Sequence, residues 1–493
     1  MQLSASDFHR AYRPSECDLR VYLHQKGIKA AHPGPYEEVI RRLGIRHERT
    51  HFATFPDIVD LSQGSSEERQ TNTLKAIQAG ARAVYQPFFA ATVQLGGKAC
   101  EVVGIPDFLI REGENYVIRD VKMSRRINDK DHPEIPWQLR LYAWLFELAV
   151  GYPPVRLEVF NGKSELIIVE GEGCVDELSR LIALISAANE PFEPVGWTRC
   201  GGCGYHDRCW TEAEERNDVA LVLKVDKNLA RALRSINVAS YDQLLAQFDE
   251  ARLSAFEKSW GKRTQKVGKA AADILLSARA LLSKQPISLA APALPATKNF
   301  VMFDLEGLPP HLDELDKIYL WGMQVFGDNP SPYMAATAGF GLNGDKEGWD
   351  SFLDCAGKLI AFHGNIPFVH WSHYERTKIK AYIDRHGDRD GVAAAILANL
   401  FDLLPVTQNA VMLPLPSYSL KVVEEYVGFT RTQDEYGGAW SMAHYIEATE
   451  TEDEATRHKL MNDILKYNEE DLAATWAVLC WLKSFGAGVT ATA

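Results

Sequence analysis

Apolar and polar residues alternate along several short stretches in the first third of the chain. The alternation covers residues 91–97, 100–113 and 114–123, and a Glu-Gly-Glu-Asn turn separates the last two stretches. Successive side chains of a strand point to opposite faces, so a period of two predicts strands with one buried face. Residues 155–162 and 164–173 alternate in the same way and predict a β-hairpin.

Other segments show the wider spacing of apolar residues that is typical of helices. One such segment covers residues 65–86, where Ser65 or Ser66 fits as the N-cap and Glu68 lies near the first turn. Pro136 predicts the start of a second helix over residues 137–152. Farther along, residues 300–307 predict a strand and residues 458–482 predict a long helix.

The chain has 493 residues, which is too many for one ordinary core, so two or three domains are expected. Residues 283–300 contain three prolines among small residues and predict a linker. A second, softer boundary follows Trp210, where charged helical sequence begins. We therefore expect an α/β (α+β) protein with segments at 1–216, 217–290 and 299–493.

The composition, with 46% hydrophobic and 24% charged residues, is that of a soluble globular protein. No uncharged apolar run approaches the roughly 18–20 residues of a membrane span, and the first residues lack the apolar core of a signal peptide. We therefore expect a cytoplasmic protein, in which structural disulfides are rare.

The net charge of −13 argues weakly against nucleic acid as a partner, but the charge is uneven. Residues 217–290 contain twelve Lys or Arg and seven Asp or Glu, a net charge of +5. Five basic residues lie close together there, namely Lys258, Lys262, Arg263, Lys266 and Lys269. Such a segment suits phosphate binding, and a solvated helix face explains the charge equally well.

A first group of chemically useful residues follows the alternating stretches. Asp120 and Lys122 are two apart on one predicted strand and therefore share a face, and a neighbouring strand could bring Asp107 beside them. Two carboxylates and a lysine suit phosphodiester hydrolysis with Mg²⁺ or Mn²⁺. A lone D-x-K tripeptide is more often an exposed strand with alternating charges.

Three further features favour a catalytic site over an exposed charged strand. They are His47 on an earlier helical stretch, Gln138 and Tyr142 four apart on the next helix, and three clustered cysteines. With them, roughly the first 210 residues resemble RecB-family nucleases of the PD-(D/E)xK superfamily, in the iron–sulfur branch with the AddB nuclease domain and CRISPR-associated exonucleases. The resemblance implies a restriction-endonuclease-like fold and a helicase as a candidate partner. It assigns His47, Asp107 and Asp120 to the metal, and Lys122, Gln138 and Tyr142 to catalysis.

Cys200, Cys203 and Cys209 lie within ten residues and indicate a metal centre. The resemblance implies that Cys17, a lone N-terminal cysteine, is the fourth ligand of a [4Fe–4S] cluster. Zinc is the alternative, because His206 completes a C-x₂-C-x₂-H-x₂-C set without Cys17. That set is tight for tetrahedral geometry and leaves Cys17 unexplained, so we favour the cluster.

In the basic middle segment, residues 225–247 predict a helix, a short turn and a second helix, and residues 259–282 repeat this theme more loosely. The pattern resembles helix-hairpin-helix modules, which implies contacts with the DNA backbone. The usual glycine is replaced by Ser235-Ile236-Asn237. A plain helical connector is the alternative, and the basic charge favours DNA contact.

A second group of carboxylates lies in the C-terminal part. Asp304 and Glu306 share one strand face, and Tyr467 and Asp471 share one helix face. Carboxylates arranged in this way can hold two metals for in-line phosphodiester hydrolysis, with the tyrosine orienting water. Residues Asn299 to Phe485 resemble the RNase H-like 3′–5′ exonucleases of the DEDDy type, narrowly the YprB-like domains. Asp304, Glu306 and Asp471 would then be metal ligands.

The second resemblance has one departure. The middle acidic residue of the family commonly follows phenylalanine, whereas this chain offers Tyr374-Glu375. We assign Glu375 to the metal. Asp402 is another carboxylate, better explained as a cap between helix and loop, and His370 and His373 are better explained as packing or substrate contacts.

The sequence therefore predicts a fused, metal-dependent nuclease that hydrolyses DNA, exonucleolytically, in repair, recombination or defence. An RNA-directed exonuclease is one alternative. A nucleic-acid-binding scaffold with a degenerate C-terminal site is another.

Overall fold

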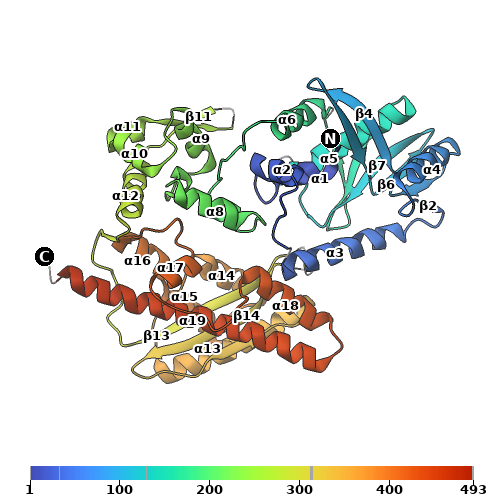
Figure 1. The fold of residues 1–493 in the computed structure, drawn as a ribbon. Helices are drawn as coiled ribbons and strands as arrows, with labels where there is room; N and C mark the ends of the chain where they lie inside the picture. The colour runs from blue at the N-terminus through green and yellow to red at the C-terminus, as the bar shows by residue number, and fades with distance from the viewer. Residues whose placement is uncertain are drawn as a thin grey trace. The chain divides into compact units, whose positions relative to one another are not determined.

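The computed structural model describes residues 2–32, 34–128, 130–171, 173–261, 263–310, 312 and 315–490. The chain divides into two compact units, shown in Figure 1. The first comprises Met1–Pro33, Glu37–Val195 and Arg199–Thr211, and the second comprises Gly34–Tyr36, Gly196–Thr198 and Glu212–Ala493.

Two sheets form the centre of the first unit. The larger has the order β2 (Ile58–Asp60), β3 (Ala83–Tyr85), β6 (Phe108–Glu112), β7 (Asn115–Val121), β8 (Leu157–Phe160) and β9 (Leu166–Val169). The smaller has the order β1 (Gln2–Ser4), β5 (Lys98–Gly104) and β4 (Phe89–Leu95). The predicted hairpin is confirmed, because β8 and β9 pair antiparallel. The stretch predicted as one strand over 100–113 is divided between the two sheets, with Asp107 in the connection.

The helices of the chain up to residue 215 are α1 (Ala5–Tyr12), α2 (Asp18–Gln25), α3 (Pro35–Phe52), α4 (Ser66–Gln78), α5 (Glu134–Val150), α6 (Val175–Ile185), α7 (Trp197–Cys200) and α8 (His206–Glu215). The N-cap prediction for α4 is confirmed, because Ser65 and Glu68 form a capping box. Helix α5 contacts both sheets and carries Leu139 and Phe146 into the core.

The sheet of the second unit has five strands. Its order is β15 (Met334–Thr337), β14 (Lys317–Gly327), β13 (Asn299–Leu308), β16 (Phe368–His370) and β17 (Leu400–Asp402). Strands β13, β14 and β15 pair antiparallel, whereas β13, β16 and β17 pair parallel. The predicted strand over 300–307 is confirmed. This mixed architecture agrees with the expected α/β class and its two nuclease folds.

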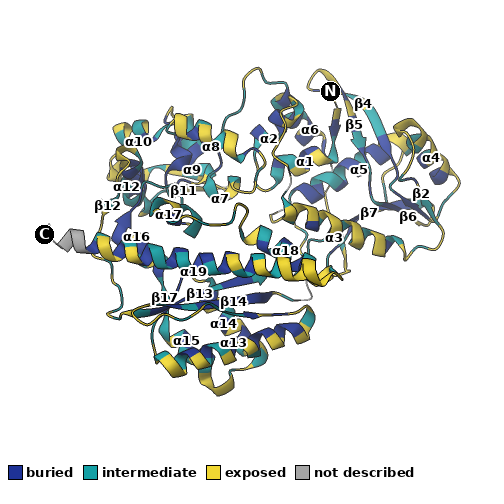
Figure 2. Cartoon of the chain, turned by 60° about the horizontal axis from the view of Figure 1, so that its bottom comes forward, coloured by how far each residue is buried: buried dark blue, intermediate teal, exposed yellow. Residues whose placement is uncertain are grey.

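Helices cover both faces of this sheet, as Figures 1 and 2 show. They are α13 (Gly341–His363), α14 (Tyr374–His386), α15 (Val392–Asn399), α16 (Leu403–Ala410), α17 (Leu420–Tyr426), α18 (Gly438–Glu450) and α19 (Glu454–Thr490), so the predicted long helix is confirmed. Val301 and Phe303 pack toward α13, whereas Phe300 and Met302 pack toward α19. Asp304 and Glu306 are an even number of residues from Phe300 along β13, so their carboxylates lie on the same face as Phe300, which α19 covers. Within the described ranges, no helix is both long and apolar enough to cross a membrane.

The basic middle segment contains α9 (Lys227–Ser235), α10 (Tyr241–Gln247), α11 (Glu250–Ala255), β10 (Glu257–Trp260), β11 (Arg263–Lys266) and α12 (Ala270–Ser283). The predicted helix–turn–helix is confirmed in α9 and α10, where Asn237 takes the left-handed φ of 62° that a glycine would favour. The looser second helix–turn–helix predicted for residues 259–282 is wrong, since β10 and β11 form an antiparallel hairpin. Lys262 lies outside the described residues.

The segment predicted as a linker is ordered along the core of the second unit. Strand β12 (Ile287–Ser288) pairs antiparallel with β18 (Val411–Met412), and Leu294 packs against the cluster that contains Phe300. The stretch therefore contributes backbone hydrogen bonds and apolar contacts to this unit.

Candidate active sites

The first acidic group lies where β7 ends. The Asp120 side chain is fully buried, and its Oδ2 lies 2.6 Å from Lys122 Nζ. The shared face expected from the D-x-K spacing is therefore confirmed. Asp107, from the connection between β5 and β6, accepts a hydrogen bond from the Val121 amide at 2.7 Å. This bond fixes the Asp107 carboxylate beside the end of β7.

Electrostatics show that these three side chains act on one another. The pKa of Asp107 lies well above the ordinary value because the carboxyl is buried and Asp120 lies close to it. Burial lowers the pKa of Lys122, but Asp120 and Asp107 outweigh burial and hold this pKa above its usual value. The site therefore holds two neighbouring carboxyl groups whose charge one ammonium group offsets in part, and a divalent cation would offset the rest.

Helix α5 supplies the next two side chains. Gln138 donates from Nε2 to the Tyr142 hydroxyl at 2.7 Å. Burial raises the pKa of Tyr142 well above its ordinary value, and Asp120 and Asp107 raise it further, so the hydroxyl stays protonated near both carboxylates. A Cβ on Gly104 of β5 would lie 2.9 Å from Tyr142 Cδ1. The glycine thus lets α5 approach the sheet closely enough to place Tyr142.

Helix α3 brings a residue that the sequence reasoning missed. Glu48 contributes to the electrostatics of both Asp107 and Lys122, and its Oε1 accepts a bond from the Tyr85 hydroxyl at 2.6 Å. The neighbouring His47 bonds through Nε2 to the Asn161 carbonyl at 3.0 Å and stacks on Phe160. Only the position of Glu48 next to His47 in the sequence could have indicated it.

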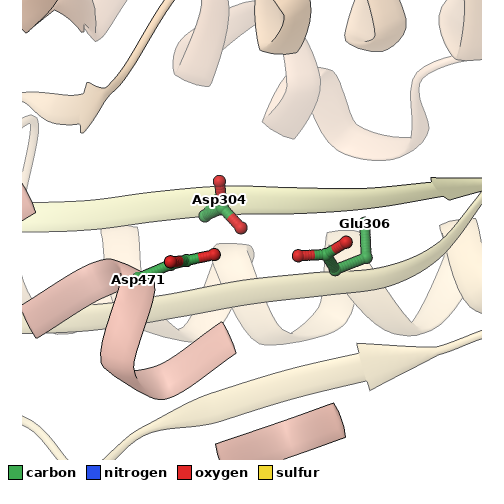
Figure 3. A group of neighbouring side chains, drawn as sticks. All are labelled: Asp304, Glu306 and Asp471. Atoms are coloured by element: carbon green, nitrogen blue, oxygen red, sulfur yellow. The ribbon is translucent and has the colours of Figure 1, made fainter. Parts of the chain in front are cut away.

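The second acidic group combines a strand and a helix (Figure 3). Asp304 and Glu306 come from β13 and Asp471 comes from α19, and one oxygen of each lies within 4.8 Å of the others. Among the described residues, this is the one group of at least three potential His, Cys, Asp or Glu ligands that close together. The three oxygens converge as ligands of a divalent cation would.

Two cations from other elements face this trio. Arg431 pairs with both Asp471 and Glu424. Burial raises the pKa of Glu306 to about 8 and Asp471 adds to the shift, whereas Lys421 opposes it. Burial also raises the pKa of Asp304 well above its ordinary value, and Asp471 raises it further. The trio is therefore crowded with like charge that the two cations offset only in part.

Helix α19 also carries two residues that position the trio. Asn468 donates from Nδ2 to Asp304 Oδ2 at 2.8 Å and accepts at Oδ1 from the Tyr333 hydroxyl at 2.9 Å. The adjacent Tyr467 is buried, lies one turn from Asp471, and has its pKa raised by burial and by all three carboxylates. The structure thus brings Tyr467 together with all three carboxylates.

Glu375 is placed differently from the trio. It is buried, and its Oε2 bonds to His370 Nδ1 at 3.0 Å. Its charge acts on Asp304, but it is not part of the three-ligand group. The capping role expected for Asp402 is confirmed, because it accepts from the Leu404 amide at the start of α16.

The cysteines of the first unit also lie near one another. Burial raises the pKa of Cys209 to about 12, and Cys17, Cys203 and Cys200 raise it further. These four side chains and His206 line one small cavity. No three of the five side chains, all of them described, have ligand atoms within 4.8 Å of one another. The eight cysteines, which all lie in the described ranges, form no disulfide.

Comparison with protein families finds known domain types in the two parts of the chain that contain the acidic groups. Residues 36–210 match the PD-(D/E)XK nuclease superfamily, and residues 301–483 match the RNase_H superfamily. The chain therefore contains a PD-(D/E)XK nuclease domain followed by an RNase H superfamily domain. Together these domains support a phosphodiester-hydrolysing nuclease, and nuclease domains of these types typically use divalent metals.

More specific similarities are weak. No curated protein matches the chain. Among solved structures, one titled "Crystal structure of SSO0001" is similar at 15% identity, covering 41% of this chain and 83% of that chain, with a TM-score of 0.22. A likeness of this strength supports no conclusion about the present chain.

Proposed function

We propose that the protein is a two-site DNA exonuclease of RecB-like and YprB-like ancestry, in which each domain hydrolyses phosphodiesters. The observation that carries this proposal is the convergence of Asp304, Glu306 and Asp471 within 4.8 Å, in a chain that has a second pair of neighbouring carboxyl groups at Asp107 and Asp120. DNA as the substrate, an exonucleolytic mode, a role in repair, recombination or defence, and a cytoplasmic location belong to the proposal.

In the N-terminal domain, Asp107 and Asp120 would hold Mg²⁺ or Mn²⁺, which supplies a hydroxide nucleophile and offsets charge on the phosphate. Lys122 lies 2.6 Å from Asp120 and can donate a hydrogen bond to a phosphate oxygen as charge develops there. Gln138 holds the Tyr142 hydroxyl at 2.7 Å and so fixes its direction beside the carboxylates. Glu48 and His47 are the two candidates on α3 for completing the site.

In the C-terminal domain, Asp304, Glu306 and Asp471 would hold the divalent cation. Tyr467 lies one turn from Asp471 on α19 and would orient the attacking water. Arg431 and Lys421 add positive charge beside the trio, which suits the approach of a phosphate. Glu375 is a metal ligand in this proposal only if its bond to His370 is exchanged for the cation.

In the same proposal, Cys17, Cys200, Cys203 and Cys209 hold a [4Fe–4S] cluster that joins the N-terminal helices to the end of the domain. A tetrahedral zinc site with bonds of about 2.3 Å would bring its sulfur atoms to about 3.8 Å from one another. No three of these described donors have ligand atoms within 4.8 Å of one another, so they are not drawn together as tightly as zinc ligands are. A cluster therefore fits the donor set better than zinc bound to His206.

The test is cleavage of end-labelled single- and double-stranded DNA with Mn²⁺ by anaerobically purified full-length protein. The wild type, Asp120→Asn, Asp304→Asn and the double variant are compared. We expect each single variant to lose a distinct part of the product pattern and the double variant to lose all cleavage. A double variant as active as the wild type would overturn both sites.

Two other functions have specific observations behind them. The His370–Glu375 bond favours a C-terminal domain that binds nucleic acid without cutting it, in which case Asp304→Asn leaves the products unchanged. The RNase H superfamily match suits RNA as well as DNA, and matched RNA oligomers in the same assay distinguish the two substrates.

A further inference from the structure

The hairpin of β10 and β11 presents a tryptophan and an arginine at its tip. Trp260 is the last residue of β10, pairs directly with Arg263, and is 59% exposed. Gly261 follows with a φ of 59°, as a short turn between two strands requires. A large aromatic side chain is thus held out into solvent at a place where the strands end.

The base of the hairpin is fixed to its surroundings. Lys258 forms an ion pair with Asp226, the N-cap of α9. Beyond the strands, the Val267 amide donates to the Phe256 carbonyl at 2.9 Å, and Phe256 packs edge-on against Phe248 at 5.3 Å. An isolated two-stranded hairpin is only marginally stable, so these contacts let the tip keep its shape without a partner.

One face of the hairpin has the composition of a base-stacking platform. Strand register places Lys258, Trp260, Arg263 and Gln265 on the same face. Within the part of the chain that the structure describes, Arg263 and Lys266 form no ion pair. Lys258 Nζ lies 6.0 Å from the centre of the Trp260 ring. The exposed ring therefore lies among polar and cationic side chains, whereas the core of a protein interface is depleted of charge.

We propose that this hairpin binds single-stranded nucleic acid, with Trp260 stacking on an unpaired base and Arg263 holding the flanking phosphate on the same face. Lys266, which the register places on the opposite face, would hold a second phosphate where the strand passes the edge of the hairpin. The inference rests on the proposed nuclease function in one respect, which is that the bound strand is the substrate. A flat aromatic ring stacks on any base, and the two cations bind the backbone, so the element selects unpaired strands without reading sequence.

The test measures binding apart from cleavage. Anisotropy of labelled oligothymidylate and oligouridylate, with full-length protein in EDTA, gives Kd for the wild type, Trp260→Ala, Trp260→Phe and Arg263→Glu/Lys266→Glu. Trp260→Ala should raise Kd by about 5- to 100-fold, the loss expected for one stacked base, and Trp260→Phe should restore most of the affinity. In Arg263→Glu/Lys266→Glu, the slope of log Kd against log salt concentration should fall by about 1.4, which corresponds to two phosphates of a single strand.

Matched controls lie on the opposite face of the β13 sheet from the acidic trio. Phe362→Ala removes an aromatic side chain of α13 that is 76% exposed, and Lys358→Glu/Lys380→Glu reverses two exposed charges on α13 and α14. Both controls should bind within twofold of the wild type. The inference would be overturned if Trp260→Ala left Kd unchanged for both oligomers. It would also be overturned if the control variants lost as much affinity as the hairpin variants.

The outcome also separates this inference from the proposed function. Hydrolysis of a small chromogenic phosphodiester should be the same in Trp260→Ala as in the wild type, because such a substrate has no second base to stack. If the wild type binds strands through Trp260 but hydrolyses nothing, the hairpin assignment stands and the nuclease assignment fails. A loss of affinity confined to one oligomer would support the inference and identify the preferred strand.

Discussion

Asn468 of α19 donates to the Asp304 carboxylate of β13 at 2.8 Å, a contact between residues 164 positions apart in sequence. The same amide fills the space above Gly322, because a Cβ there would lie 1.6 Å from Asn468 Oδ1. One residue thus sets both the distance between helix and sheet and the orientation of a proposed metal ligand.

Removing this amide should cost activity and stability together. In an Asp120→Asn background, Asn468→Ala should lower C-terminal cleavage at least tenfold and the free energy of unfolding by about 1–3 kcal/mol, since two buried hydrogen bonds are lost. Gly322→Ala should be as destabilising because of the clash. The variant that combines Asn468→Ala with Gly322→Ala should be more stable than the sum of the two single effects predicts. Loss of the Asn468 amide leaves room for the new methyl group. Additive denaturation energies would contradict this packing.

The acidic residue of α3 offers a second prediction. Glu48 acts on Asp107 and Lys122, whereas His47 is bonded to a backbone carbonyl. In an Asp304→Asn background, Glu48→Gln should raise the Mn²⁺ concentration for half-maximal cleavage about tenfold, and His47→Ala should change it less. Metal titration of cleavage rates measures this. The reverse order would assign the metal to His47.

The pKa of Glu306 gives a dependence of stability on pH. A carboxyl whose pKa is raised from 4.5 to about 8 by burial and Asp471 contributes its full stability below about 4.5, and this contribution is lost as pH rises through about 8. In EDTA, the free energy of unfolding should fall between pH 5 and pH 8 by on the order of 2 kcal/mol more in the wild type than in Glu306→Gln. Equal slopes in urea denaturation would show that Glu306 is not the titrating group. Because ligands must be deprotonated, metal affinity should rise over the same interval.

The cysteine group gives a fourth prediction. Cys17→Ser should lose the brown colour and absorbance of a cluster and lower Tm, because a bound cluster stabilises the fold that assembles its ligands. Cys480→Ser, an exposed cysteine of α19, is the matched control and should retain both properties. His206→Ala should keep the colour. A brown, stable Cys17→Ser protein would contradict the ligand set.

The sequence predicted those features that depend on local periodicity. Asp120 and Lys122 share a strand face, and Asp304 and Glu306 do the same, because side chains alternate along any strand. The sequence did not single out Glu48, because its electrostatic effect on Asp107 depends on the tertiary placement of α3. The β10–β11 hairpin was missed because, apart from Trp260, its two strands consist of polar residues and so show no alternation.

Strand β12 bears on how this protein can be dissected. A fragment that ends near residue 290 would retain Ile287 and Ser288 but lose Val411 and Met412, their hydrogen-bonding partners. Calorimetry of a fragment from Glu212 onward should accordingly show one heat-absorption peak rather than two. Proteases should cut slowly between residues 284 and 299, although three prolines and small residues give that stretch the composition of an interdomain tether.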